Sequence, residues 1–122
     1  MSKTDELRDE AARLLKWYPP NAVIAGRDRV CDYWLRHDGV EWLTPAHDDH
    51  PIPDTLDGIA ALWREHLPGW EWWRFRLDDG NLIWEARVLG TTKRATLFDS
   101  GDELFDRLAL FVAALKCERS GG

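Results

Sequence analysis

Residues 70–98 constrain the fold more than any other stretch of the chain. Aromatic and charged residues alternate over 70–77 and again over 82–89, on either side of the turn sequence Asp-Asp-Gly-Asn. A period of two is typical of a half-buried strand, and Gly and Asn tolerate the positive φ of a tight hairpin turn. A third alternating run, 93–98, follows a second turn. The stretch therefore predicts a three-stranded antiparallel meander with one buried face.

The alternation also assigns the side chains to faces. The expected buried face of the second strand is apolar: Leu82, Trp84, Ala86 and Val88. Four arginines are expected to share the solvent face, near Glu71 and Glu85: Arg74, Arg76, Arg87 and Arg94. Trp72 and Trp73 are adjacent on one strand, so they point to opposite sides of the sheet. One of these two tryptophans is expected outside the main core.

Helical spacing of apolar residues predicts helices around the sheet, over 4–17, 27–37, 55–66 and 102–117. Pro19-Pro20 is expected to end the first helix. Ser100 and Glu103 are expected to form a capping box for the last. Residues 21–37 read as strand or helix, with a helix favoured. Residues 40–44 read as a short strand, a candidate fourth strand at the sheet edge.

These patterns predict an α+β fold, a single domain over residues 1–122. We expect a three- to four-stranded antiparallel meander packed against two or three helices. A chain of 122 residues is long enough for a hydrophobic core. It has no apolar run near the roughly 20 residues that a membrane span needs, and its polar N-terminus is unlike a signal peptide. We therefore expect a cytoplasmic protein without a membrane partner, with reduced cysteines.

The charge pattern points to protein partners. The net charge of −6 argues against direct nucleic-acid binding through phosphates. The acidity is concentrated in residues 27–66, where nine acids outnumber four arginines. Such a segment attracts a protein with a basic surface. We expect three aspartates of this segment to contact the partner: Asp48, Asp49 and Asp54.

The tryptophan content supports the same prediction. The chain has eight tryptophans, and exposed tryptophans often anchor protein interfaces. We expect Trp72 or Trp73 to contact the partner, and a third hypothesis uses exposed indoles to bind a sugar or a nucleobase. An exposed sheet edge or indole patch also allows a homodimer.

The alternative function is a small metal-dependent enzyme or ligand-binding protein that uses the loop His47-Asp48-Asp49-His50. Imidazole and carboxylate groups bind divalent metals. This spacing matches no closed structural site, and a solvated polar loop is the preferred interpretation. No cofactor is expected, because the sequence has no Gly-x-Ser-x-Gly nucleophile motif and no glycine-rich phosphate loop.

Residues 70–117 resemble small phage and prophage accessory proteins. The shared layout has tryptophan-bearing strands, a hairpin and a capped C-terminal helix that begins near Phe98-Asp-Ser-Gly-Asp-Glu-Leu-Phe105. It is similar to helix–sheet–helix sandwich proteins of phages and to small inhibitors of bacterial defence systems. The resemblance implies a non-enzymatic, acidic protein-binding module, a phage-encoded inhibitor or accessory protein that occupies a partner's surface. It implies no site residue.

Overall fold

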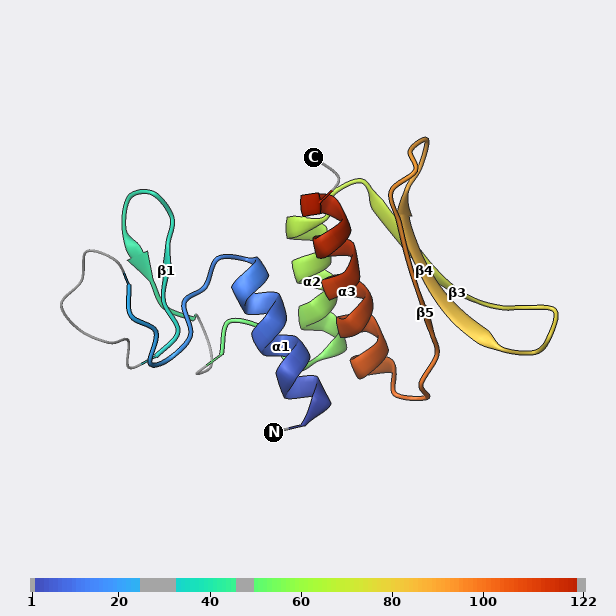
Figure 1. The fold of residues 1–122 in the computed structure, drawn as a ribbon, viewed down its shortest axis with the longest axis horizontal. Helices are drawn as coiled ribbons and strands as arrows, with labels where there is room; N and C mark the ends of the chain where they lie inside the picture. Colours follow the sequence, from blue (N-terminus) through green and yellow to red (C-terminus); the bar gives the residue numbers. More distant parts are fainter. Residues whose placement is uncertain (1, 25–32, 46–49, 121–122) are drawn as a thin grey trace.

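The computed structural model describes residues 2–24, 33–45 and 50–120. The elements follow in this order: α1 (Lys3–Leu14), β1 (Arg36–His37), β2 (Trp42–Leu43), α2 (Leu56–His66), β3 (Trp70–Arg76), β4 (Leu82–Val88), β5 (Arg94–Phe98) and α3 (Glu103–Ser120). In Figure 1 the helices lie between the β3–β4–β5 sheet and the β1–β2 hairpin. An antiparallel sheet packed against helices confirms the predicted α+β fold.

The three-stranded sheet has the predicted meander topology, in the order β3-β4-β5. In the first hairpin Trp70 pairs with Val88 and Arg76 pairs with Leu82. Gly80 has a φ of +92°, the left-handed value that a turn of this kind requires. The N–H of Leu77 donates to the carbonyl of Asn81 at 2.8 Å and closes the loop. The turn signal in the sequence was therefore correct.

The register corrects the predicted arginine face. Trp72 lies opposite Ala86, and Arg74 lies opposite Trp84. Because cross-strand partners share a face, Arg74 and Arg76 lie on the same side as the buried residues of β4. We call this side, which faces the helices, the inner face. Arg87 and Arg94 lie on the other side, the outer face, because they pair with each other one position out of phase with Trp84 and Ala86.

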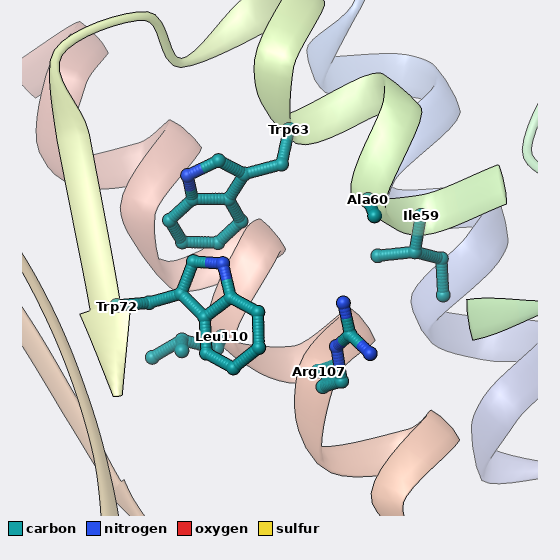
Figure 2. A pocket seen from close by; sticks show the side chains of 6 residues that line it. All are labelled: Ile59, Ala60, Trp63, Trp72, Arg107 and Leu110. Carbon is teal, nitrogen blue, oxygen red and sulfur yellow. The ribbon is translucent and has the colours of Figure 1, made fainter. Parts of the chain in front are cut away.

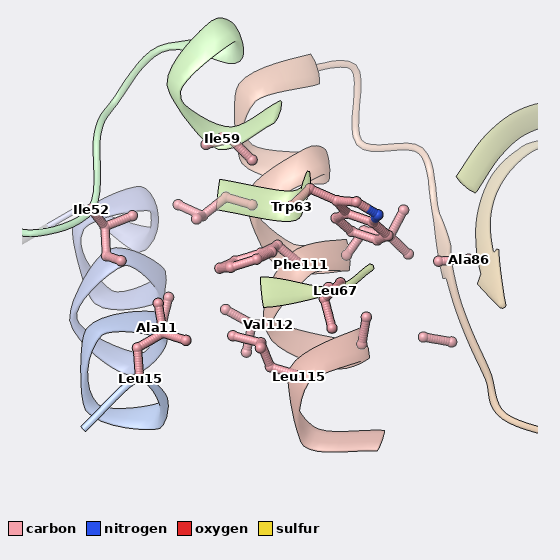
Figure 3. Packing of buried hydrophobic residues seen from close by; sticks show 14 of the residues in the cluster. Ala11, Leu15, Ile52, Ile59, Trp63, Leu67, Ala86, Phe111, Val112 and Leu115 are labelled. Atoms are coloured by element: carbon pink, nitrogen blue, oxygen red, sulfur yellow. The ribbon is translucent and has the colours of Figure 1, made fainter. Parts of the chain in front are cut away.

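The core lies between the helices and the inner face (Figure 3). α3 supplies more of the core than any other element, because its apolar residues recur around more than one side of the helix. Its fully or almost fully buried apolar residues are Leu108, Leu110, Phe111, Val112, Ala114 and Leu115. α1 packs against α3 through Ala11 and Ala12, which are both 0% exposed. Lys116 and Glu10 form an ion pair across the same two helices.

The predicted fourth strand is not part of this sheet. β2 pairs instead with β1, in a separate two-stranded sheet. The favoured helix over 27–37 is wrong for residues 33–37, which are not helical, and residues 27–32 lie outside the described residues. Two long-range hydrogen bonds between Tyr18 and Leu35 hold this segment extended, at 2.6 and 3.0 Å. Helical periodicity alone does not reveal such a pairing.

The end of α1 also differs from the prediction. α1 ends at Leu14, before the prolines, because Lys16 has a φ of +73° and the N–H of Trp17 donates back to Ala12. This is a Schellman ending with lysine at the position that glycine usually occupies. In contrast, α2 begins as expected after Thr55, whose Oγ1 accepts from the N–H of Gly58 at 3.1 Å.

The predicted capping box of α3 is wrong. Asp102, not Ser100, caps this helix, since its Oδ1 accepts from the N–H of Phe105 at 3.1 Å. Ser100 is occupied elsewhere: its hydroxyl donates to Asp106 at 2.7 Å. The buried carboxylate of Asp106, one turn into the helix, therefore accepts the hydrogen bond of the serine that the local pattern assigned to the cap.

Candidate binding surface around Trp72

Trp72 is the most exposed tryptophan of the inner face. It is 37% exposed, whereas Trp70, two residues earlier on the same face, is 6% exposed. The difference follows from what covers each ring. Trp70 donates its indole N–H to Glu118 of α3 at 2.8 Å, and its carbonyl accepts from the indole of Trp63 in α2 at 3.2 Å. Trp72 thus lies where helical cover of the sheet becomes incomplete.

A shallow depression surrounds the Trp72 ring (Figure 2). Six residues from β3, α2 and α3 line it: Ile59, Ala60, Trp63, Trp72, Arg107 and Leu110. The Trp63 and Trp72 rings meet nearly edge to face, with centroids 6.4 Å apart. The space inside is about 10 Å³, near the minimum that holds one water molecule. It is far smaller than the pockets that enclose small ligands, so the surface fits a single small group of a larger partner.

Two arginines flank the indoles of this surface. The guanidinium carbon of Arg107 lies 4.6 Å from the ring centroid of Trp72. That of Arg74 lies 5.0 Å from the centroid of Trp84. Such contacts hold a cation against the negative face of an aromatic ring. Arg107 is not among the contacts predicted from the sequence. Its place four residues after Glu103 is the signal that could have found it, since the two side chains form an ion pair at 3.8 Å and the Arg107 side chain stays 15% exposed.

A carboxylate network fixes Trp84 beneath this surface. The indole N–H of Trp84 donates to Asp99 at 3.0 Å and to Asp106 at 3.2 Å. Asp106 is 0% exposed and also accepts from the N–H of Ser100 at 3.0 Å. Asp99 in turn pairs with Arg74 at 3.5 Å. Because each buried polar group has a partner, this network rigidifies the sheet end on which Trp72 stands.

Trp73 lies on the outer face, as its adjacency to Trp72 predicted. It is half-buried, and the guanidinium carbon of Arg87 lies 5.5 Å from its ring centroid. The most exposed aromatic residue of this face is Phe98, at 71%. Phe98 helps to line an open hollow of about 180 Å³ together with Leu77, Ile83, Thr96 and Leu97. The alternating pattern already places Phe98 on this face. The fold adds that no described residue covers the Phe98 ring.

Of the three aspartates predicted to contact the partner, only Asp54 lies among the described residues. Asp54 is exposed and lies two residues before α2. Asp48 and Asp49 lie outside the described residues. Asp38 and Glu41 are exposed at the turn between β1 and β2. Hydrogen bonds from the backbone N–H groups of Glu41 and Val40 lower the pKa of Asp38, so this carboxylate closes the turn while it adds negative charge to the surface.

His50, the described member of the predicted metal loop, holds two parts of the fold together. Its Nδ1 accepts from the backbone N–H of Ile52 at 3.0 Å, so Nε2 carries the proton that points to Asp9 at 2.8 Å. The ring also lies 4.8 Å from that of Trp34. A metal at His50 would have to displace one of these partners. Among the described residues, no three His, Cys, Asp or Glu side chains are grouped so that they could hold a metal ion, and His47 lies outside this part of the chain.

A second hollow, of about 270 Å³, lies between the end of α1, the β1–β2 hairpin and α2. His66 and Arg36 are among the polar residues of its lining. Burial lowers the pKa of His66, which favours the neutral imidazole. Two residues of the lining, Pro45 and Pro51, lie close in the chain to residues 46–49. Because residues 46–49 are outside the described part of the structure, we assign no ligand to this hollow.

Comparisons with known proteins identify no relative: no family model, curated protein or solved structure matches this chain. Of the helices in the described ranges, none is both long and apolar enough to cross a membrane.

Proposed function

We propose that this chain is a protein-binding module that acts by occupying the surface of a partner protein, with Trp72 as its anchor. The observation that carries the proposal is the exposure of this indole in a shallow apolar depression beside Arg107. Tryptophan and arginine are the residue types most enriched among interface residues that dominate binding energy. A depression that accepts one small group suits a partner's side chain better than a free ligand.

The charge of the partner depends on which part of the module it meets. Arg74 and Arg107 beside Trp72 favour a partner that is acidic at the anchor. The sequence prediction of a basic partner concerns the acidic segment, where Asp54 is exposed and Asp48 and Asp49 stay predicted contacts. A small acidic module of this kind agrees with the proposed role as a phage-encoded inhibitor or accessory protein in the cytoplasm.

The test is capture of partners from bacterial lysate with the tagged chain, read by mass spectrometry. The parent chain is compared with Trp72→Ala, Trp73→Ala and Asp54→Lys. We expect one protein to be enriched by the parent chain and by Trp73→Ala, and to be lost with Trp72→Ala. The Trp73 variant is the matched control, because it removes the same side chain from the opposite face.

Each variant separates one version of the proposal from the others. Loss of the partner with Trp73→Ala alone would move the contact to the outer face. Loss with Asp54→Lys alone would favour the basic partner of the acidic segment. A partner that none of the three variants affects would overturn both the anchor and the acidic contact.

A further inference from the structure

β3 is an edge strand with a free side. The sheet order places β4 on one side of it, and no strand among the described residues pairs with the other. β3 is seven residues long, from Trp70 to Arg76. Long free edges present a row of unpaired backbone groups to other chains. The question is which groups of β3 point outward.

The hydrogen bonds at the two ends of β3 answer it. The N–H of Trp70 donates to the carbonyl of Leu67 at 3.1 Å, and its carbonyl accepts from Trp63, so both groups face away from β4. At the other end, the N–H of Leu77 donates to Asn81, toward β4. Antiparallel strands alternate the direction of these groups residue by residue. The N–H and C=O of Trp72, Arg74 and Arg76 therefore face the free edge, and no hydrogen bond to them is seen in the described part of the chain.

The side chains of these same three residues lie on the inner face, and the two arginines carry positive charge. The Arg74 side chain is 45% exposed and is only partly neutralised by Asp99 at 3.5 Å. Arg76 is exposed, and its guanidinium donates to a neutral acceptor, the carbonyl of Gly80, at 2.6 Å. Trp72 adds the apolar depression beside them. Along the edge the pattern is thus apolar, cationic, cationic at alternate positions.

We infer that the free edge of β3 binds an extended acidic segment of the partner protein as a fourth, antiparallel strand. The backbone of the segment hydrogen-bonds to Trp72, Arg74 and Arg76, while its alternate side chains meet theirs on the inner face. Two acidic side chains then lie opposite the arginines, and an apolar one lies beside Trp72. Strand addition of this kind draws affinity from backbone hydrogen bonds and specificity from alternate side chains. The inference rests on the proposed function and names the chemistry of the partner.

The probe is a capped, fluorescein-labelled peptide, Thr-Glu-Thr-Glu-Thr-Leu-Thr. In antiparallel pairing its glutamates face Arg76 and Arg74, and its leucine faces Trp72. We expect saturable binding to the whole chain by fluorescence anisotropy. Arg76→Glu should weaken it by roughly tenfold, because it replaces an attractive charge pair with a repulsive one. Arg94→Glu is the matched control, since Arg94 is an exposed arginine on the opposite edge strand and the outer face.

Two further measurements distinguish an added strand from simple charge attraction. A peptide N-methylated at its glutamates and leucine loses the amide donors that face β3, and should no longer bind. Hydrogen exchange followed by NMR should slow at the amides of Trp72, Arg74 and Arg76 when the unmodified peptide is added.

The inference is overturned if the N-methylated peptide or a lysine-for-glutamate peptide binds as well as the acidic one. It is also overturned if Arg94→Glu weakens binding as much as Arg76→Glu does. Self-association through β3 in the absence of peptide would make a second copy the occupant instead. If the peptide fails while Trp72→Ala still abolishes partner capture, strand addition is wrong and the proposed function stands.

Discussion

Trp70 and Trp72 lie two residues apart on the same face of the same strand, yet they belong to different parts of the molecule. Trp70 is 6% exposed and tied to α3 through Glu118. Trp72 is 37% exposed, and beside α3 its ring lies against Arg107 and Leu110, with no hydrogen bond to the helix among the described residues. The alternation that places both rings on one face says nothing about how far a helix extends over that face. The covered end of the sheet stabilises the fold, and the open end supplies a surface for binding.

The largest expected difference comes from replacing one buried and one exposed indole by alanine. Trp84→Ala removes a side chain that is 1% exposed and should lower the free energy of unfolding by about 3–5 kcal/mol. Trp72→Ala removes a partly exposed ring and should cost about 1–2 kcal/mol, from its contacts with the Trp63 and Trp84 rings and with Arg107. Urea denaturation followed by circular dichroism measures both. Equal losses would make Trp72 a core residue and remove the distinction between the two ends.

A smaller effect is expected at the buried carboxylate that accepts from the Trp84 indole. Asp106→Ala leaves the hydroxyl and N–H of Ser100 without their acceptor and should cost about 2–3 kcal/mol. Asp106→Asn keeps the shape and one acceptor oxygen, so it should cost less. The same denaturation experiment checks both variants. If Asp106→Ala proved neutral, the network would not be what holds Trp84 in place.

The smallest effect is a pH dependence at Glu118. The hydrogen bond from the Trp70 indole, helped by Lys93, lowers the pKa of this carboxyl below its ordinary value of 4.5. A lowered folded-state pKa stabilises the fold above the unfolded-state value, and this contribution disappears as the pH falls through the folded-state value. Glu118→Gln should therefore be less stable than the parent chain at neutral pH, and the difference should shrink below pH 4.5.

Denaturation of both chains at several pH values measures this difference. The control is the same comparison in a Trp70→Phe background, where the indole donor is absent and the pH-dependent part should be much reduced. A difference that stayed constant with pH would show that the indole does not act on the ionised carboxylate.

The predictions from sequence succeeded where neighbouring residues decide the structure. The hairpin between β3 and β4 follows from local alternation and from Gly80, which takes the left-handed φ that the turn needs. The start of α2 after Thr55 is a similar local matter. The predictions failed where a distant partner competed. Tyr18 holds Leu35 extended, and Asp106 withdraws Ser100 from the cap of α3.

The sequence predicted the tryptophans of the candidate site but not the side of the sheet on which its arginines lie. Adjacency on a strand required Trp72 and Trp73 to face opposite sides. Trp73 lies on the outer face, away from the main core, and Trp72 lies on the inner face where helical cover is incomplete. The sequence prediction placed Arg74 and Arg76 on the solvent face, because alternation alone does not specify which residues of β4 stand opposite them. The pairing of Arg74 with Trp84 set that register, and it placed these two arginines, which alternation already puts on the face of Trp72, on the side of the sheet that faces the helices.

The sequence by itself determined that residues 70–98 form an antiparallel meander and which side chains alternate along each strand, because both properties arise from the period of the strand and from turn residues. Only the tertiary structure decided which end of the inner face is covered. That choice depends on where α2 and α3 dock, and docking is a sum of many contacts between residues far apart in the chain. The same sum leaves Trp72 and the free edge of β3 available to a partner.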